Sequence, residues 1–535
     1  MNQLSNLTTI IEAHVAELNK PGVLSVRPGY KMQDGWPTTQ PAIVVIMSQG
    51  AAPPVLPAQI EGTPLDIRTA TDIEQLRSKQ PETYAKLAAH RAEFRDGAFP
   101  ELDPATEEAP GVAEASARGV EPEAAKPQIT YSGPAGTSLT PVTGNLTITC
   151  HASPDAGFPT LKSFLSATKS TLTIGLYDFT SAHILEAVQN AMLGKKKLEI
   201  TLDNPAKNPT ADQTDTVTLQ TLSDALGEEF VSAWALVRSN KVVPQWIYPT
   251  AYHIKVAVRD SEAMWLSSGN WNNSNQPDFD PIGSPSATDQ KTATKSDRDW
   301  HVVIENAKLA KTYEAFLKHD FDVAKAIEGG PGAGVLSADD DMEVPDVFRV
   351  AAKAGFEFHK PLRIENEHMT IIPLLTPDPG VYQPAMLKLL KSAKAKVYIQ
   401  LQYIHPSDKE GDGDFMALIE TVKEKIAAGL DVRIIVSQWQ QTNGWLERLQ
   451  AAGVNLDVVK IQNGVHNKGF VVDSKIVALG SQNWSAEGVL RNRDASVIIE
   501  NAKAASYFEQ IFVHDWTRIA TKHAQPAAMS ATGAE

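Results

Sequence analysis

Two long segments of the chain alternate strand-like and helix-like patterns. Short apolar runs at 172–176, 397–401 and 432–436 predict buried strands. Between the last two, apolar residues recur at helical spacing over 415–426, and Gly429 ends that pattern. Strands that alternate with helices indicate an α/β protein, and we expect a largely parallel sheet covered by helices on both faces.

The two segments also repeat one another in sequence. The matching stretches, first copy against second, are 153–155 with 376–378, 298–308 with 493–503, and 319–321 with 514–516. The last two matches share one constant offset and join without a gap. The period is too long for a solenoid, so the repeat predicts two α/β halves related by a pseudo-twofold axis.

The remaining sequence is arranged around these halves. The start combines a helical pattern with two strand-like runs, which predicts a small α+β accessory domain. It is followed by a stretch rich in Ala, Pro, Glu, Gly and Ser, which cannot bury enough apolar surface to fold by itself. The predicted division is 1–100 accessory domain, 101–140 disordered linker, 141–328 first half, 329–345 linker, 346–523 second half and 524–535 tail.

The composition limits the class of function. Of 535 residues, 42% are hydrophobic and 21% are charged, as in an ordinary globular protein, so a fibrous or wholly disordered chain is excluded. The formal net charge of −15 disfavours coating a long nucleic acid through bulk electrostatics, although a local basic cleft remains compatible with it. The single cysteine, Cys150, excludes an intramolecular disulfide and a multi-cysteine metal cluster.

Membrane-spanning and export signals are not evident. No stretch approaches the roughly 20 apolar residues needed to span a bilayer. The first residues lack the basic region and apolar core of a secretory signal peptide. We therefore expect a cytoplasmic enzyme, while export by a route that needs no such signal stays open.

Each half carries the same polar constellation at the same spacing. The recurring residues are His253, Lys255, Asp260, Ser268 and Asn270 in the first half, and His466, Lys468, Asp473, Ser481 and Asn483 in the second. Side chains two apart on a strand share a face, so each His and its Lys should point the same way. One such motif would be weak evidence. Two copies with identical spacing inside a wider repeat indicate a functional site.

The residue types suit phosphodiester chemistry. Histidine acts as a nucleophile or a general acid. Lysine, serine and asparagine donate hydrogen bonds to phosphate oxygens as charge develops in a transition state. If the two copies meet in one pocket, one His can attack phosphorus while the other protonates the leaving oxygen. The lysines supply the positive charge, so we expect no metal and no cofactor.

In these motifs the chain resembles the phospholipase D superfamily, whose signature, His-x-Lys-x4-Asp-x6-Gly-Ser-x-Asn, occurs twice. The resemblance covers roughly residues 145–522 and implies two pseudo-twofold-related αβα sandwich halves. It also implies catalysis through a covalent phosphohistidine that water or an alcohol resolves. By family habit His253 is the nucleophile and His466 the acid and then the base, an order that the residues alone leave open.

The resemblance further implies a carboxylate that orients each catalytic His. Asp299 and Asp494 occupy matching positions and are the candidates. Whether each serves the His of its own half or of the other half is open. We expect Asp260 and Asp473 to organise the turn after each motif strand rather than to touch substrate.

The first half departs from the family pattern twice. Ser267 stands where the signature has Gly, which we expect to tighten that turn while leaving Ser268 and Asn270 in register. Residues 271–297 also form an insertion compared with the second half. This insertion follows the phosphate-binding turn directly, so it is either a lid or specificity loop or a passive surface loop.

The leading functional hypothesis is a phospholipase D-type phosphodiesterase that hydrolyses or transfers the phosphatidyl group of phospholipids. The acidic charge balance and the single-chain tandem architecture favour it, and we expect a monomer with peripheral membrane contact. The alternative is a superfamily nuclease that cleaves DNA or RNA phosphodiesters. A binding module without catalysis is a third class, against which the intact motifs in both halves argue.

Overall fold

The computed structural model describes most of the chain. The described stretches are 5–33, 36–51, 56–70, 75, 78, 132–203, 212–239, 242–246, 251–328, 356–378, 380–409, 411–438 and 442–522. The predicted linker at 329–345 and the tail at 524–535 lie outside these residues, and so does the predicted linker at 101–140 up to residue 131. The chain divides into two compact units. The smaller comprises 1–125, 439–456 and 522–525, and the larger comprises 126–438, 457–521 and 526–535.

The smaller unit is built on a four-stranded sheet in the order β1-β2-β4-β3. Its elements are α1 (Ser5–Ala13), α2 (Val15–Leu18), β1 (Val23–Gln33), β2 (Trp36–Met47), β3 (Gln59–Ile60), β4 (Thr63–Thr69) and α12 (Thr442–Ala451). Leu7 and Ile11 of α1 pack on Ile43 and Val45 of β2. Glu447 of α12 pairs with arginines at 27 and 68 at 3.0 and 2.7 Å. This helix, which lies inside the predicted second half, therefore belongs to the smaller unit.

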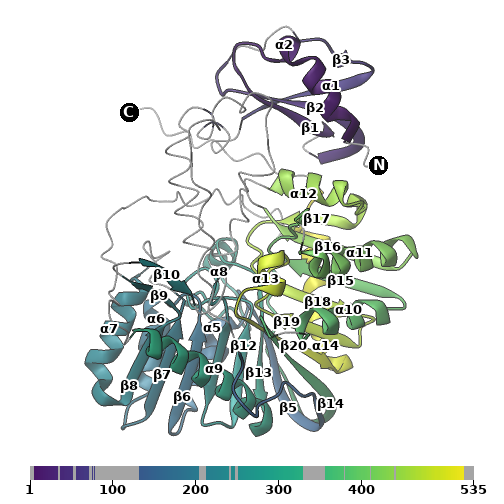
Figure 1. Ribbon diagram of the computed structural model, residues 1–535. Coiled ribbons are helices and arrows are strands. Elements are labelled where there is room, and N and C mark those ends of the chain that lie inside the picture. The colour runs from purple at the N-terminus through teal and green to yellow at the C-terminus, as the bar shows by residue number, and fades with distance from the viewer. Residues whose placement is uncertain are drawn as a thin grey trace. The chain divides into compact units, whose positions relative to one another are not determined.

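The larger unit contains a 14-stranded sheet (Figure 1). Its strands are β5 (Val142–Ser153), β6 (Thr171–Leu176), β7 (Lys197–Leu202), β8 (Phe230–Trp234), β11 (Lys255–Arg259), β12 (Ala263–Ser267), β13 (Asp299–Glu305), β14 (Leu362–Thr376), β15 (Lys396–Leu401), β16 (Asp431–Ser437), β17 (Val459–Gln462), β18 (Lys468–Val472), β19 (Ile476–Gly480) and β20 (Asp494–Glu500). A separate pair is formed by β9 (Leu236–Ser239) and β10 (Val242–Trp246).

From each outer edge toward the middle, the large sheet has corresponding strand orders. One side runs β8-β7-β6-β11-β12-β13-β5, and the other runs β17-β16-β15-β18-β19-β20-β14. The two series meet where β5 and β14 pair antiparallel, with Ile371 opposite Val142 and Leu362 opposite Cys150. The two series are therefore joined by backbone pairing at the centre of the sheet, with one register shift between Ile364 and Glu367.

The expectation of a largely parallel sheet is wrong. Only β6-β7-β8 and β15-β16-β17 pair in parallel, and the other neighbours in the large sheet are antiparallel. The reason lies in the motif strands, which are joined by tight hairpins rather than by helical crossovers. In the first hairpin Asp260 and Ser261 have φ of 55° and 53°, and in the second Asp473 and Ser474 have φ of 53° and 55°. Two consecutive positive φ values are typical of the two-residue turns that join antiparallel strands.

Both halves contain helices, and in the first half they cover both faces of the sheet. The helices are α5 (Gly157–Ser166), α6 (Ala182–Ala191), α7 (Asp215–Leu226), α8 (Ala287–Ala293) and α9 (Ala307–Glu328) in the first half, and α10 (Tyr382–Ser392), α11 (Gly413–Ala427), α13 (Ala486–Leu490) and α14 (Ala502–His514) in the second. Alternate residues of β11 face opposite sides. Val256 and Val258 join a core with α9 and α14, whereas Ala257 joins a core with α5 and α6. The mixed α/β class expected from the sequence is confirmed.

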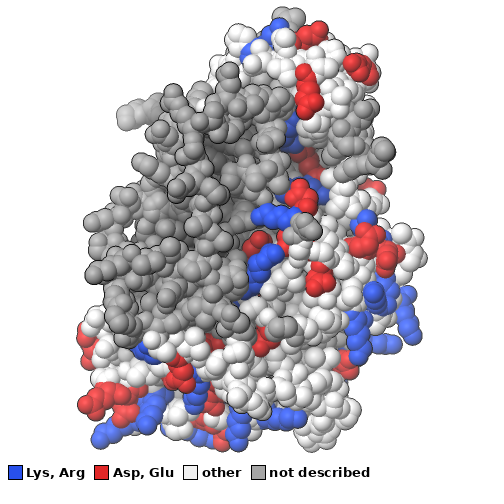
Figure 2. Space-filling model, in the orientation of Figure 1, with Lys and Arg blue, Asp and Glu red and all other residues white. Residues whose placement is uncertain are grey.

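Two further findings concern the surface and the helices. Among the described residues every helix is too short or too polar to cross a bilayer. On the face shown in Figure 2, basic and acidic side chains of the described residues are interspersed rather than segregated by sign.

Candidate active site

The two His-x-Lys motifs sit at the beginnings of matching strands. His253 comes just before β11 and His466 just before β18, and Lys255 and Lys468 are the first residues of those strands. All four side chains are buried, with the most exposed, His466, at only 6%. Charged groups removed from water in this way need compensating partners.

Each motif histidine faces a carboxylate from the opposite half. His253 Nδ1 lies 2.8 Å from Asp494 Oδ1, and His466 Nδ1 lies 3.1 Å from Asp299 Oδ1. The alternative left open by the sequence is therefore resolved geometrically, since each carboxylate contacts the His of the other half. Because an ionised carboxylate only accepts hydrogen bonds, it fixes the proton on Nδ1 and leaves the Nε2 lone pair directed elsewhere.

The electrostatics around Asp299 keep it ionised. Burial by itself raises the pKa of this carboxyl, but the neighbouring His466 and Lys468 outweigh burial and bring the pKa of Asp299 down to about 2. The carboxylate therefore carries its charge throughout the physiological pH range.

The two Ser-x-Asn turns follow β12 and β19 and contact the same carboxylates. Ser268 Oγ donates to Asp299 Oδ1 at 2.7 Å, and Ser481 Oγ donates to Asp494 Oδ1 at 2.6 Å. The buried side-chain amide of Asn270 has no hydrogen-bond partner among the described residues. A buried polar group without a protein partner is a candidate contact for a ligand. Together these contacts place parts of both halves in a single site.

The lysines lie against the backbone of their own motifs. Lys255 Nζ donates to His253 O at 2.8 Å and lies 5.3 Å from the ring centre of Tyr177. Lys468 Nζ donates to His466 O at 2.6 Å and to Ser268 O at 3.3 Å. The second contact joins the His-x-Lys motif of one half to the Ser-x-Asn turn of the other.

The remaining motif carboxylates lie at the far ends of their strands. Asp260 accepts from the backbone N–H groups of residues 169, 170 and 171, and Asp473 accepts from those of residues 394, 395 and 396. These bonds, which include one of 2.7 Å to Ser170 N, lower the pKa of both carboxyls against the opposing effect of burial. Each carboxylate ties its hairpin to the start of the neighbouring strand.

Sequence reasoning missed two buried arginines. Arg298 and Arg493 directly precede the histidine-facing carboxylates, and each binds an aspartate of the opposite half. Arg298 Nε donates to Asp515 Oδ2 at 2.9 Å, and Arg493 Nε donates to Asp320 Oδ2 at 2.8 Å. All four side chains are visible in the sequence as matched positions of the repeat, but only their reciprocal pairing in space reveals what they do.

The arginines also hold the backbone beside each motif. Arg298 N donates to Gly464 O at 2.6 Å, and His466 N donates to Arg298 O at 3.1 Å. Arg493 N donates to Ala251 O at 2.8 Å in the corresponding place. We call the two pairs, Arg298–Asp515 and Arg493–Asp320, the crossed arginine pairs.

The substitution of Ser for Gly at 267 is matched by a change in its neighbour. Ser267 Oγ accepts from Gly269 N at 2.8 Å and lies 2.6 Å from His301 Nδ1. In the second half the equivalent Gly480 packs so closely on Ser496 that an added Cβ would lie 1.9 Å from Ser496 Oγ. In the first half His301 stands in place of Ser496, lies opposite Ser267 across the strand pair and contacts its hydroxyl. Burial lowers the pKa of His301 to about 4.

The insertion at 271–297 is packed against the larger unit. Gln290 exchanges two hydrogen bonds with the backbone of Phe356, at 2.9 and 2.8 Å. Phe279 and Ala293 join an apolar cluster with Phe356 and Phe358. Near its start, Asn275 hydrogen-bonds to Asp299. The insertion therefore supports the site from one side; a role as lid or specificity loop stays a prediction.

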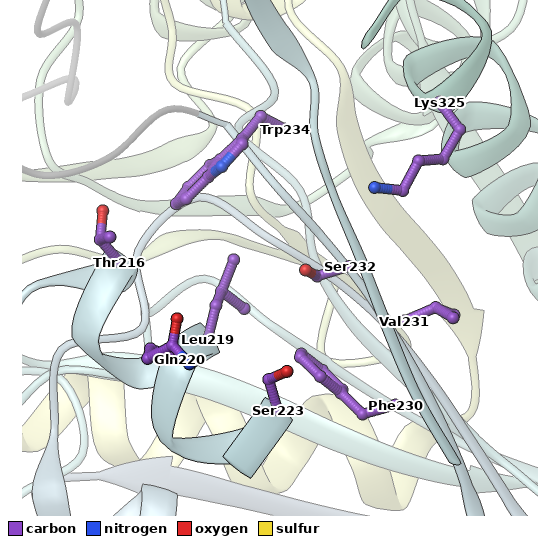
Figure 3. A pocket seen from close by; sticks show the side chains of 9 residues that line it. All are labelled: Thr216, Leu219, Gln220, Ser223, Phe230, Val231, Ser232, Trp234 and Lys325. Carbon is purple, nitrogen blue, oxygen red and sulfur yellow. The ribbon is translucent and has the colours of Figure 1, made fainter. Parts of the chain in front are cut away.

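A separate pocket of about 400 Å³ opens at the outer edge of the sheet (Figure 3). Leu219 of α7, Phe230 and Trp234 of β8, and Lys325 of α9 are among the residues that line it. None of the motif residues lines this pocket.

Parts of the chain are similar to known proteins. A family model described as "Cardiolipin synthase, PLD-like domain" matches residues 386–516. Cardiolipin synthase 2 of Staphylococcus epidermidis is 28% identical over 138 residues, which cover 24% of this chain and 26% of that protein. Phospholipase D of Rickettsia conorii is 35% identical over 86 residues, which cover 16% of this chain and 43% of that protein. The chain thus spans less than half the length of these curated relatives.

Among solved structures, the chain is similar to phosphatidylserine synthase of Haemophilus influenzae, with 12% identity and a TM-score of 0.46 over 71% of this chain and 89% of that one. The family model covers the second motif, and the first half repeats that motif at the same spacing. Residues 386–516 thus match a PLD-like domain, and the chain is similar to members of the phospholipase D superfamily.

Proposed function

We propose that this protein is a metal-independent phosphodiesterase that hydrolyses or transfers the phosphatidyl group of phospholipids through a covalent phosphohistidine. The observation that carries the proposal is the crossed pairing of His253 with Asp494 and of His466 with Asp299. Because each pair takes one residue from each half, both histidines belong to one site. Two halves of one chain, related by a pseudo-twofold axis, would then form a single catalytic unit that is complete as a monomer.

The first step uses the two histidines in different roles. His253 Nε2 attacks phosphorus and forms the N–P bond, while the P–O bond to the headgroup alcohol breaks. His466 gives its Nε2 proton to the leaving oxygen, so the alcohol departs neutral. Asp494, 2.8 Å from His253 Nδ1, stabilises the positive charge that develops on the phosphorylated imidazole.

The second step reverses the proton transfer. Water or an alcohol loses its proton to His466 Nε2 as its oxygen bonds to phosphorus, and the N–P bond breaks. The electron pair of that bond returns to His253 Nε2. With water the product is phosphatidic acid, and with an alcohol it is a new phosphatidyl ester.

Phosphate is held by donors that both halves contribute. We assign this role to Lys255, Lys468, Ser268, Asn270, Ser481 and Asn483. The amide of Asn270 and the amide oxygen of Asn483 are buried without hydrogen-bond partners among the described residues, which supports the assignment. The described residues also contain no group of three or more His, Cys, Asp or Glu side chains arranged to hold a metal ion. The lysines are the cations proposed to offset the charge of the transition state.

The choice of phospholipid over nucleic acid rests on relatives. The curated relatives that match include proteins named cardiolipin synthase and phospholipase D, and the family model carries a cardiolipin synthase description. The net charge of −15 adds support, because long polyanions bind to continuous basic surfaces. Peripheral contact with a membrane surface would deliver the substrate, and residues 1–100 are proposed as an accessory domain.

A substrate screen in the presence of EDTA tests the proposal. The protein is incubated with phosphatidylcholine, phosphatidylethanolamine, phosphatidylglycerol and cardiolipin vesicles, with and without ethanol, and in parallel with plasmid DNA, single-stranded DNA and RNA. We expect phosphatidic acid from at least one lipid, and phosphatidylethanol when ethanol is present. Degradation of nucleic acid without any lipid turnover would replace the lipid assignment with the nuclease alternative.

Two histidine variants test the mechanism. His253→Ala and His466→Ala should each abolish turnover while circular dichroism stays unchanged. His319→Ala, which removes a half-buried histidine outside the site, is the matched control. With ³²P-phospholipid, denatured wild-type enzyme should retain acid-labile, base-stable label, and His253→Ala should retain none. Label that persists in His253→Ala and disappears in His466→Ala would reverse the two roles.

A further inference from the structure

The two histidine–carboxylate pairs have unequal surroundings. In the pair His253–Asp494, carboxylate oxygen Oδ1 accepts hydrogen bonds from both Ser481 and the histidine. Oδ2 is buried without a hydrogen-bond partner among the described residues. In the pair His466–Asp299, Oδ1 receives Ser268 and the histidine, while Oδ2 accepts a third hydrogen bond from Asn275 at 3.0 Å. Asp299 therefore accepts hydrogen bonds on both carboxylate oxygens, whereas Asp494 accepts them on one.

Asn275 is well placed to cause this difference. It is 1% exposed, and its side-chain amide makes three hydrogen bonds. Nδ2 donates to Asp299 Oδ2 at 3.0 Å and to Asp297 Oδ2 at 3.1 Å, while Oδ1 accepts from Asn270 N at 3.0 Å. Two carboxylates on one side and an N–H on the other fix which end of the amide is which.

The second half has no equivalent side chain. Counted from the Ser-x-Asn turn, the position of Asn275 corresponds to Gly488, where an added Cβ would lie 2.2 Å from Asn483 O. There the turn runs directly into α13, whose first turn is capped by Ser485. The insertion in the first half replaces this short helix and thereby admits Asn275.

We propose that Asn275 is a positioning residue whose hydrogen bond to Asp299 weakens the attraction of this carboxylate for protonated His466. His466 can then serve both as the acid of the first step and as the base of the second. This inference deepens the proposed function and rests on it. Asn275 touches neither substrate nor the reacting atoms, and acts through Asp299.

The physical argument concerns how strongly a carboxylate holds its histidine as a cation. A hydrogen bond donated to an ionised carboxylate stabilises its negative charge and weakens its attraction for the imidazolium. A residue that must both give and take a proton works best when its pKa lies near the operating pH. For His253 the opposite holds. Its phosphorylated ring is cationic, so it is stabilised best by a carboxylate, Asp494, whose negative charge is not weakened by a further hydrogen-bond donor.

Other charged groups face this pair and remain in place when Asn275 is changed. Lys468 Nζ lies 3.2 Å from the ring nitrogens of His466, and His301 lies on the same strand as Asp299. Asp297 shares the amide of Asn275. Arg298, next to Asp299, is held by Asp155 and Asp515.

Asn275→Ala tests the inference without relying on turnover. In protein labelled with ¹³C at histidine Cε1, the His466 signal is identified by its loss in His466→Asn, and the His253 signal by its loss in His253→Asn. We expect the pKa of His466 to rise by up to about one pH unit in Asn275→Ala. The pKa of His253 should be the same as in the wild type, since the substitution leaves the surroundings of Asp494 unchanged. Asn273→Ala, in the same insertion but bonded to Asp212, should change neither.

The same variant makes a kinetic prediction on a phospholipid that the wild type turns over. A higher pKa leaves less of His466 as base, so below neutral pH the phosphohistidine should be resolved up to about tenfold more slowly and accumulate. The alkaline limb of kcat/KM should move up by the same interval, because His466 stays protonated to higher pH. A role limited to packing would slow both steps alike and shift no limb.

Each outcome is decisive. An unchanged pKa of His466, equal shifts in both histidines, or an Asn275→Ala protein that does not fold would overturn the inference. If the wild type cleaves no phosphodiester, the proposed function fails on that ground, while the titration still decides separately whether Asn275 weakens the attraction of Asp299 for protonated His466.

Discussion

Replacing Arg298 by methionine gives a sharp test of how the two halves are held together. Its guanidinium is fully buried and donates to Asp515 at 2.9 and 3.1 Å, to Ser153 O at 3.0 Å, and to Asp155. Methionine fills similar volume and removes all of these donors. The two aspartates then remain in the interior with only weaker neutral or partly exposed partners, such as Gln400 at 2.8 Å from Asp515.

The expected loss of stability follows from that burial. Breaking a buried ion pair by removing one partner typically costs about 3–5 kcal/mol, because an uncompensated charge is left behind. Arg298 serves two carboxylates, so we place Arg298→Met at the upper end of this range. The matched control is Arg363→Met. Arg363 is 46% exposed and pairs with Glu305 and Glu365, and loss of such surface pairs costs about 1 kcal/mol or less.

Urea unfolding followed by tryptophan fluorescence measures both variants, because Trp265, Trp271, Trp300 and Trp484 are buried in the larger unit. The midpoint should fall clearly for Arg298→Met and barely for Arg363→Met. If the two variants lose the same stability, or if Arg298→Met loses less than about 1 kcal/mol, the crossed arginine pairs do not hold the halves together in the way we argue.

Three further predictions follow from the site. Asp494→Asn should lower phospholipid turnover at least about a hundredfold with the fold intact, because an amide no longer holds His253 in its tautomer; turnover near wild type would contradict the crossed pairing. Treatment with EDTA should leave turnover unchanged, and loss that added Mg²⁺ or Zn²⁺ restores would contradict metal independence. Because burial lowers the pKa of His301 to about 4, below the usual 6.5, the unfolded chain takes up the proton first. Stability should therefore fall by about 3 kcal/mol as pH drops from 6.5 to 4, and His301→Ser should flatten that slope in urea titrations.

Much of the site could be anticipated because the sequence contains it twice. The repeated His-x-Lys spacing, followed in both copies by Asp, Ser and Asn at fixed distances, separates His253 and His466 from the other histidines, including the matched pair His319 and His514. The same duplication hides the pairing of the carboxylates, since Asp299 and Asp494 stand at equivalent positions. Which one reaches which histidine depends on how the halves meet, and no local pattern encodes that.

Other features escape sequence reasoning because they depend on contacts between distant parts of the chain. The outer strands of each half, which alternate with helices in the sequence, do pair in parallel. The same prediction is wrong for the motif strands, since the turns at Asp260 and Asp473 make antiparallel hairpins. The proposed role of Asn275 has no signal in the repeat, because glycine stands at the corresponding position of the second half. Arg298 and Arg493 stand in the matched stretches, yet their aspartate partners lie in the opposite copy.

The pairing of β5 with β14 and the crossed histidine–carboxylate contacts have a consequence for how the protein is made. His253 can contact Asp494 only after a further 241 residues of the chain have been synthesised. A ribosome that adds roughly 5–20 residues per second needs about 10–50 s to bridge that interval. During this time the first motif lacks its carboxylate, and β5 presents an open edge until β14 has been made. A nascent chain on the ribosome thus lacks the complete site until Asp494 has been added, and its exposed edge is where chaperone protection would matter most.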